Sequence, residues 1–143
     1  MVNRDTIERF TRLLRQYLKH LRQLAEVPDD RFLADPHLIG SARYYLTVSI
    51  EACLDIANHL IASEGLRSPK DYKDAFRVLH EAGVLSGELS ARMQALAGLR
   101  NLLVHVYWDV DDALIHQSLR TELDDFEQYA LAILTHLESS IST

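Results

Sequence analysis

The sequence predicts an all-α fold, a single-domain, up-down-like bundle of about five helices. Apolar residues recur at intervals of three and four along most of the chain, which is the spacing of one helical face. Prolines and glycines stand where such runs begin and end. No stretch shows the sustained apolar–polar alternation of a half-buried strand, although residues 104–110 could be briefly extended.

The first two expected helices have clear ends. The first occupies the N-terminal segment and ends at Pro28, because proline cannot continue a helix and disfavours helical backbone in the residue before it. The second begins with Asp35 as N-cap and Pro36 in the first helical position, where the missing N–H is not needed. It runs to Gly65, since glycine readily takes the left-handed conformation that ends a helix.

The third and fourth helices are connected by a short turn. We expect the third to start at Ser68-Pro69, with Asp71 in its third helical position, and to run to Gly83. Ser86 caps the fourth, which should reach about His105.

The last helix is expected to be capped by Asp109 or Asp111 and to cover residues 112–141, with a bend near residues 117–119. The chain has no internal repeat, low-complexity tract or interdomain linker. Residues 1–143 are therefore expected to form one helical domain.

The composition is that of an ordinary globular protein, with 48% hydrophobic and 25% charged residues. No apolar run approaches the roughly 18 residues needed to cross a membrane. Cys53 is the only cysteine, which excludes an intrachain disulfide and a cysteine metal cluster. We therefore expect a cytoplasmic protein with no membrane partner. The net charge of −6 argues against broad, nonspecific nucleic-acid binding, which usually leaves a basic footprint.

Four polar or aromatic functional groups gather near the end of the fourth expected helix, in the stretch Arg100-Asn101-Leu102-Leu103-Val104-His105-Val106-Tyr107. Polar groups buried without partners cost free energy, so a purely structural helix rarely collects them. Arginine can hold a phosphate with a planar fork of donors, and histidine can move protons near neutral pH. The stretch therefore points towards phosphodiester chemistry.

The helical spacing leaves the geometry of this site open. Arg100 and His105 lie about 140° apart around an ideal helix and ~7.5 Å apart along it, whereas Asn101 and His105 share a face. The arginine could reach around the helix, the helix could unwind before His105, or a second copy of the chain could complete the site. In the structural alternative, Arg100 pairs with a carboxylate and His105 is simply favoured by the helix dipole.

Other candidate groups are weaker. The remaining histidines lack the spacing of paired metal ligands, so no metal site is expected. The aspartates within residues 109–112 are explained by helix capping and by the charge preference of a first helical turn. Glu51 and Asp55 lie one turn apart on an otherwise apolar helix and could pair with Arg100 or Arg43, or could mark a partly exposed edge.

Several motifs occur in one order along the chain. They are Arg-x4-His-x-Tyr at residues 100–107, Leu54-Asp55-Ile56-Ala57-Asn58-His59, Pro69-x-x-Tyr72-x-x-x-Phe76-x-x-Leu79, and Gly83-Val84-Leu85. In this combination the sequence resembles the HepT-like HEPN family, small all-α toxins of prokaryotic toxin–antitoxin pairs. The motifs cover about residues 40–115, and the helix pattern covers the whole chain.

The resemblance implies a homodimeric, metal-independent endoribonuclease, the toxin of a type VII-like toxin–antitoxin system. It assigns Arg100 to the scissile phosphate and His105 to proton transfer, in a cleft between protomers. Asn101 would orient the histidine or the phosphate. It further implies a nucleotidyltransferase antitoxin as partner, which adds AMP from ATP to Tyr107 and so blocks RNA. This chain itself would then need no cofactor.

Two alternatives remain open. The chain could be a noncatalytic HEPN module that binds a nucleotide or docks a nucleotidyltransferase, which would suit its acidic charge. It could also be a structural helical dimer in which the residue 100–107 motif is internal packing, and in that case Arg100→Ala should lower thermal stability sharply.

Overall fold

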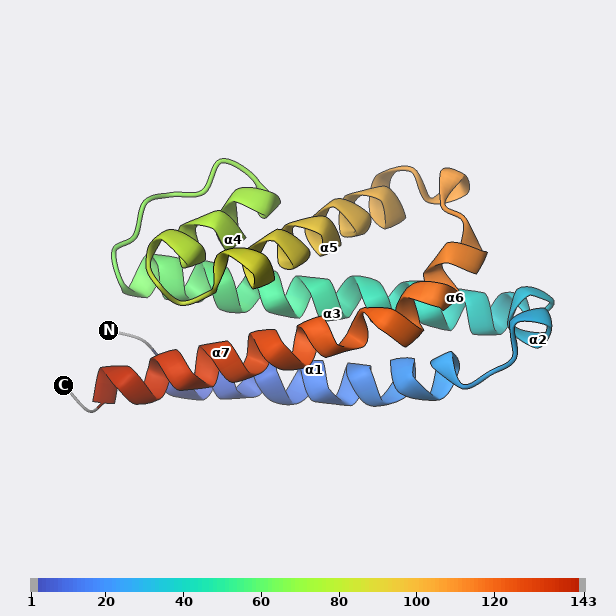
Figure 1. Cartoon of the computed structure of the whole chain (residues 1–143), viewed down its shortest axis with the longest axis horizontal. Coiled ribbons are helices and arrows are strands. Elements are labelled where there is room, and N and C mark those ends of the chain that lie inside the picture. The colour runs from blue at the N-terminus through green and yellow to red at the C-terminus, as the bar shows by residue number, and fades with distance from the viewer. Residues whose placement is uncertain (1–2, 142–143) are drawn as a thin grey trace.

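All the regular secondary structure over residues 3–141, the part that the computed structural model describes, is helical (Figure 1). This confirms the all-α prediction, but the described residues form seven α-helices and one 3-10 turn instead of about five helices. The elements are α1 (Arg4–Ala25), α2 (Asp29–Leu33), α3 (Pro36–Ser63), α4 (Tyr72–Glu81), α5 (Gly87–His105), the 3-10 turn η1 (Tyr107–Asp109), α6 (Asp112–Thr121) and α7 (Leu123–Ile141).

Helix α3 is the centre of the arrangement. It runs antiparallel to α1 and packs mainly on it, while α4 and α5 pack on each other along another side of α3 (Figure 1). The core is aliphatic and aromatic, and the fully buried Tyr129 of α7 donates its hydroxyl to the Cys53 carbonyl of α3 at 2.8 Å. Cys53 is buried as expected, and burial raises the pKa of its thiol. Within the described residues, no helix has both the length and the apolar character needed to cross a membrane.

Most helix ends lie where the sequence predicts them. Asp35 accepts the N–H of His37 at 2.9 Å, and Ser86 accepts the N–H of Leu89 at 3.1 Å, so both act as N-caps. Gly65 and Gly83 take φ values of 65° and 80°, the left-handed conformation that ends helices cheaply only at glycine.

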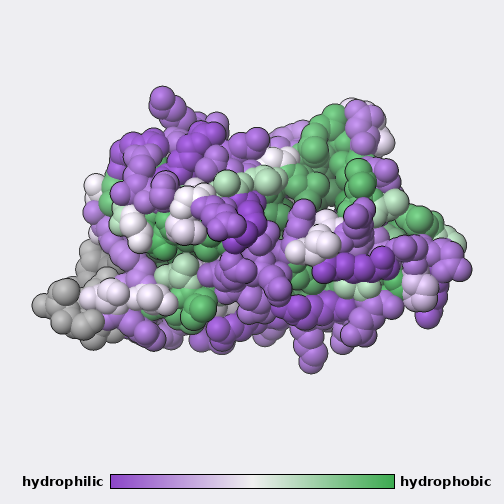
Figure 2. Space-filling view, in the orientation of Figure 1, coloured by the Kyte–Doolittle hydropathy of each residue, from purple (hydrophilic) through white to green (hydrophobic). Residues whose placement is uncertain are grey.

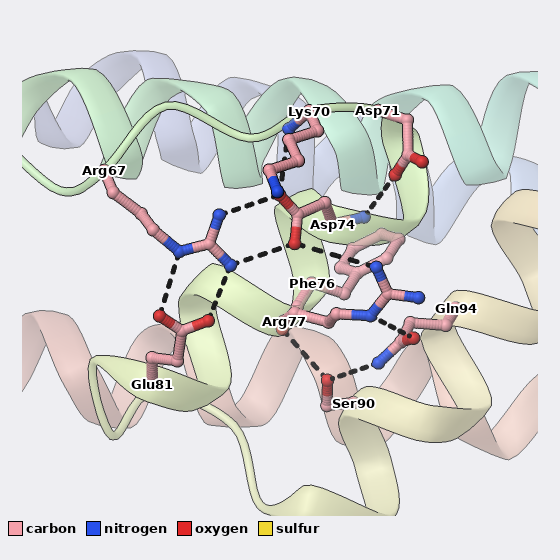
Figure 3. Close-up of polar contacts among 9 residues, drawn as sticks. All are labelled: Arg67, Lys70, Asp71, Asp74, Phe76, Arg77, Glu81, Ser90 and Gln94. Atoms are coloured by element: carbon pink, nitrogen blue, oxygen red, sulfur yellow. Dashed lines mark hydrogen bonds and ion pairs between the residues drawn. The ribbon is translucent and has the colours of Figure 1, made fainter.

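Helix α4 begins three residues later than Ser68-Pro69 predicts. Asp71 is its N-cap and not its third residue, because the Asp71 carboxylate accepts the N–H of Asp74 at 2.8 Å. The preceding segment is held outside the helix by Arg67, which forms hydrogen bonds with Asp74 and Glu81 (Figure 3).

Three further expectations need correction. The segment before Asp35 contains the short helix α2, which the sequence analysis missed. The last helix is divided at Glu122, whose φ of −111° lies outside the helical range, so the interruption comes after the predicted bend at 117–119. Within residues 104–110, α5 continues to His105 and the 3-10 turn η1 follows, so the expected extended backbone is found at Val110, with φ −82° and ψ 127°, and not along the whole segment.

Candidate active site at the end of helix α5

Helix α5 remains regular through the whole Arg100–His105 interval. The N–H of Val106 still donates to the Leu102 carbonyl at 2.9 Å, and the helix ends at Val106, where φ is −135°. The helix therefore does not unwind before His105, which removes one of the three ways in which Arg100 and His105 could have met.

Arg100 is directed towards α3 and α4. Its Nε and Nη2 donate to Oε1 of Glu51 at 3.3 and 3.0 Å, which confirms one of the pairings expected for Glu51. Its Nη1 lies 3.4 Å from Oδ1 of Asn101, a weak hydrogen bond. The guanidinium carbon stands 4.9 Å from the centre of the Tyr72 ring, within cation–π distance. The arginine side chain is only 14% exposed.

His105 lies at the other end of the motif, exposed on the last residue of α5. Asn101 is half-buried, and its amide oxygen faces Arg100. The structure thus brings Arg100 and Asn101 together, while Arg100 and His105 have different surroundings within one protomer.

Tyr107 and Trp108 follow directly in η1 and are 59% and 67% exposed. Their rings pack edge to face, with centres 5.3 Å apart. Leu102 of α5 and Leu114 of α6 are also exposed, and Figure 2 shows hydrophobic residues gathered near the end of α5. Tyr107 is therefore accessible for modification.

Arg43 of α3 holds this turn in place, a role that the sequence analysis did not assign. Its Nη1 donates to the Tyr107 carbonyl at 2.7 Å and its Nη2 to the Val110 carbonyl at 3.1 Å. Its Nε donates to Asp112 at 2.8 Å. Every residue has a backbone carbonyl, so the sequence does not show which carbonyls Arg43 binds. Only the position of Arg43 next to the exposed Tyr44 on α3 could have suggested this role.

Asp55 stands one turn after Glu51 on α3 and has no part in the Arg100 pair. Burial raises the pKa of its carboxyl, and the negative charge of Glu51 adds to that effect. The carboxylates after α5 have structural roles, since Asp111 caps α6 through the N–H of Ala113 and Asp112 binds Arg43. Residues 3–141 contain no group of three or more potential metal ligands.

A groove of about 990 Å³ separates α5 from α6 and the start of α7. Its lining includes Leu99 and Leu102 of α5 and Leu114 of α6, together with the carboxylates of Glu122, between α6 and α7, and Asp125 of α7. Burial raises the pKa values of these two carboxyls. The groove opens beside the exposed patch of Tyr107 and Trp108, so the end of α5 combines apolar and acidic surface.

An all-α chain that ends one helix with an arginine, an asparagine, a histidine and an exposed tyrosine belongs to the class of small helical ribonucleases. Residues 14–133 match the family model described as Ribonuclease HepT-like, and the chain therefore belongs to the HepT-like family.

Two curated relatives carry nuclease names. The chain is 31% identical over 111 residues to the mRNA nuclease HepT of Shewanella oneidensis, covering 76% of this chain and 84% of the relative. It is 29% identical over 133 residues to the tRNA nuclease HepT of Aphanizomenon flos-aquae, covering 92% and 89%. Among solved structures, the tri-AMPylated Shewanella oneidensis HEPN toxin in complex with the MNT antitoxin superposes with a TM-score of 0.86 at 28% identity, covering 93% of this chain and 99% of the toxin.

Proposed function

We propose that this protein is a metal-independent endoribonuclease, the toxin of a type VII-like toxin–antitoxin pair. The observation that carries the proposal is the end of α5, where a held but incompletely bonded Arg100 precedes an exposed His105. Family membership and the nuclease names of two relatives support RNA as the substrate.

The chemistry needs a base, an acid and a cation, which these residues can supply. The 2′-hydroxyl of RNA is an internal nucleophile. The proton of the 2′-hydroxyl passes to His105, and the same ring or the His105 of a second protomer gives a proton to the 5′-oxygen that leaves, while the Arg100 guanidinium stabilises the charge that develops on the phosphate. The P–O5′ bond breaks as the O2′–P bond forms, which leaves a 2′,3′-cyclic phosphate and a 5′-hydroxyl. Asn101 orients Arg100 or the phosphate.

We further propose that two protomers form the site. Arg100 and His105 have separate surroundings within one chain, and the exposed Leu102 and Leu114 near the end of α5 suit burial against a second copy. Mixing inactive Arg100→Ala and His105→Ala chains tests this arrangement. A site built from both protomers regains activity in the mixed dimer, whereas a site within one protomer stays inactive.

Tyr107 is proposed as the residue that a nucleotidyltransferase antitoxin modifies with AMP from ATP. It is exposed and lies two residues after His105. The added AMP brings bulk and negative charge to a place that must receive a phosphate, so RNA would be repelled. The solved complex with an AMPylated HEPN toxin supports this regulation. Intact mass after co-expression with the antitoxin should show AMP additions that Tyr107→Phe abolishes.

RNA digestion in EDTA tests the central proposal. His105→Ala should lower the cleavage rate about 10²- to 10⁴-fold, the range for a lost acid–base group. A DNA oligonucleotide of the same sequence should stay intact, because it lacks the 2′-hydroxyl. Equal cleavage by the wild type and His105→Ala would remove His105 from the mechanism.

A second candidate is a noncatalytic module that docks the nucleotidyltransferase. The exposed Tyr107 and Trp108 favour it, since exposed aromatic residues are common at protein–protein interfaces. Purified protein that binds its partner but cleaves no RNA under any of these conditions would favour this function over the first.

A further inference from the structure

We propose that Glu51 and Tyr72 are positioning residues that fix the guanidinium of Arg100 with one edge directed to the scissile phosphate. The inference rests on the proposed ribonuclease function and adds two residues, from α3 and α4, that the motif at the end of α5 does not contain.

The hydrogen-bond donors of Arg100 are only partly used. A guanidinium has five N–H groups in a planar fork. The single oxygen Oε1 of Glu51 accepts from Nε and Nη2 at 3.3 and 3.0 Å and so occupies one edge of the fork. The other edge, formed by Nη1 and Nη2, has only the weak contact with Asn101 at 3.4 Å. Two N–H groups on that edge match two phosphate oxygens.

Tyr72 restrains the same side chain in the remaining direction. Its ring lies against the guanidinium at 4.9 Å, so the plane of the fork is held by the ring while Glu51 holds its edge. Tyr72 is the first residue of α4, next to the N-cap Asp71. Arg67 binds Asp74 in the first turn of that helix, which fixes where α4 begins and therefore where the Tyr72 ring stands (Figure 3).

The charge of Glu51 makes this role testable. A carboxylate beside a phosphate site weakens anion binding, so its benefit must come from orientation and not from attraction. Glutamine at this position keeps an acceptor oxygen but removes the charge. A positioning role therefore predicts that kcat falls in Glu51→Ala and stays near the wild-type value in Glu51→Gln. A purely structural ion pair predicts no such difference between the two substitutions.

Steady-state RNA cleavage by the wild type, Glu51→Ala and Glu51→Gln tests the proposal. Glu51→Ala should lower kcat about 10- to 100-fold, because a catalytic group misplaced by about 1 Å can cost 10²-fold. Glu51→Gln should keep kcat near the wild-type value and lower KM. Tyr72→Ala should also reduce kcat, and Tyr72→Phe should restore it. The control is Glu8→Ala, which removes a glutamate of similar exposure from another Arg–Glu pair, Arg4–Glu8 at 3.3 Å on α1, and should leave both constants unchanged.

The NMR chemical shift of the Arg100 Nε–H group gives a second readout of whether the side chain is held in one orientation. The signal should be dispersed in the wild type and in Glu51→Gln, and should move to the averaged position of a mobile arginine in Glu51→Ala. A wild type that cleaves RNA while Glu51→Ala keeps its kcat would overturn this inference alone. Equal losses of kcat in Glu51→Ala and Glu51→Gln would also overturn it. A wild type no more active than His105→Ala would instead overturn the proposed function and this inference with it.

Discussion

Two arginines on neighbouring parts of the molecule are bonded very differently. Arg67, before α4, uses all three of its side-chain nitrogens on carboxylates, with Asp74 at 2.8 and 2.9 Å and Glu81 at 2.9 and 2.6 Å (Figure 3). Arg100, on α5, has one carboxylate oxygen and a weak amide contact. One guanidinium is saturated, and the other keeps an edge for a ligand.

The exposed fraction of the side chain does not show which of the two arginines has the fuller set of hydrogen bonds. The Arg67 side chain is 42% exposed and that of Arg100 only 14%. The hydrogen bonds to Glu81 and Asp74 nonetheless raise the pKa of Arg67, and the same network holds the pKa of Asp74 well below its usual range. The number and length of the hydrogen bonds, four at 2.6–2.9 Å for Arg67 and three at 3.0–3.4 Å for Arg100, therefore distinguish these two arginines better than accessibility does.

The largest expected difference comes from removing each arginine in turn. Arg100→Ala should lower RNA cleavage about 10²- to 10³-fold, the loss typical of one electrostatic donor in an active site, with little change in Tm. Arg67→Ala should lower Tm clearly and reduce the cleavage rate of the folded protein far less than Arg100→Ala, because Arg67 reaches the site only through the position of Tyr72. Thermal unfolding and initial rates measured on the same preparations check both. A sharp fall of Tm in Arg100→Ala would favour the structural alternative for this motif.

Arg43 provides an intermediate case that sharpens the comparison. Like Arg67 it donates through all three of its side-chain nitrogens, but two of its bonds hold the carbonyls of Tyr107 and Val110 next to the proposed site. Arg43→Ala should destabilise the fold by about 2 kcal/mol, as expected for hydrogen bonds to a charged group, and should also reduce cleavage. Urea unfolding and steady-state rates measure the two effects. A loss of stability with full activity would show that the turn does not need to be held.

The sequence was sufficient for the elements whose signals are local. Asp35, Ser86 and Gly65 end helices through bonds and torsions within a few residues, and these positions were predicted correctly. The start of α4 was misplaced because it depends on Arg67 binding Asp74 and Glu81, seven and fourteen residues away.

The candidate site shows the same limit. The residues of the Arg100–Tyr107 stretch were recognisable by type and spacing, and the Glu51–Arg100 pair was one of several options. The contacts of Arg100 with Tyr72 and of Arg43 with backbone carbonyls join separate helices, so no spacing along the chain encodes them. The order of motifs along the chain predicts which functional side chains are present. The residues that these side chains contact depend on how the helices pack.

Acid should unfold the Arg67 region first. The folded-state pKa of Asp74 lies below that of an unfolded aspartate, about 4, because Arg67 and the N–H of Lys70 stabilise the carboxylate. Its contribution to stability is therefore complete above about pH 4 and is lost as pH falls below that value. Urea unfolding between pH 7 and pH 3 should show this loss in the wild type. Asp74→Asn should be less stable at pH 7 and show a shallower pH dependence; parallel curves would contradict the assignment.

Tyr107→Phe should have the smallest effect on folding. It therefore separates the regulation by the antitoxin from the stability and the RNA cleavage of the protein. The ring is exposed, and Arg43 binds the backbone carbonyl of Tyr107, which phenylalanine keeps. Stability should therefore change by no more than about 0.5 kcal/mol, as for most surface substitutions, and RNA cleavage should persist. Incubation with the antitoxin and ATP should inhibit the wild type but not Tyr107→Phe. Inhibition of both would show that the antitoxin acts by docking on the end of α5 and not by modifying this hydroxyl.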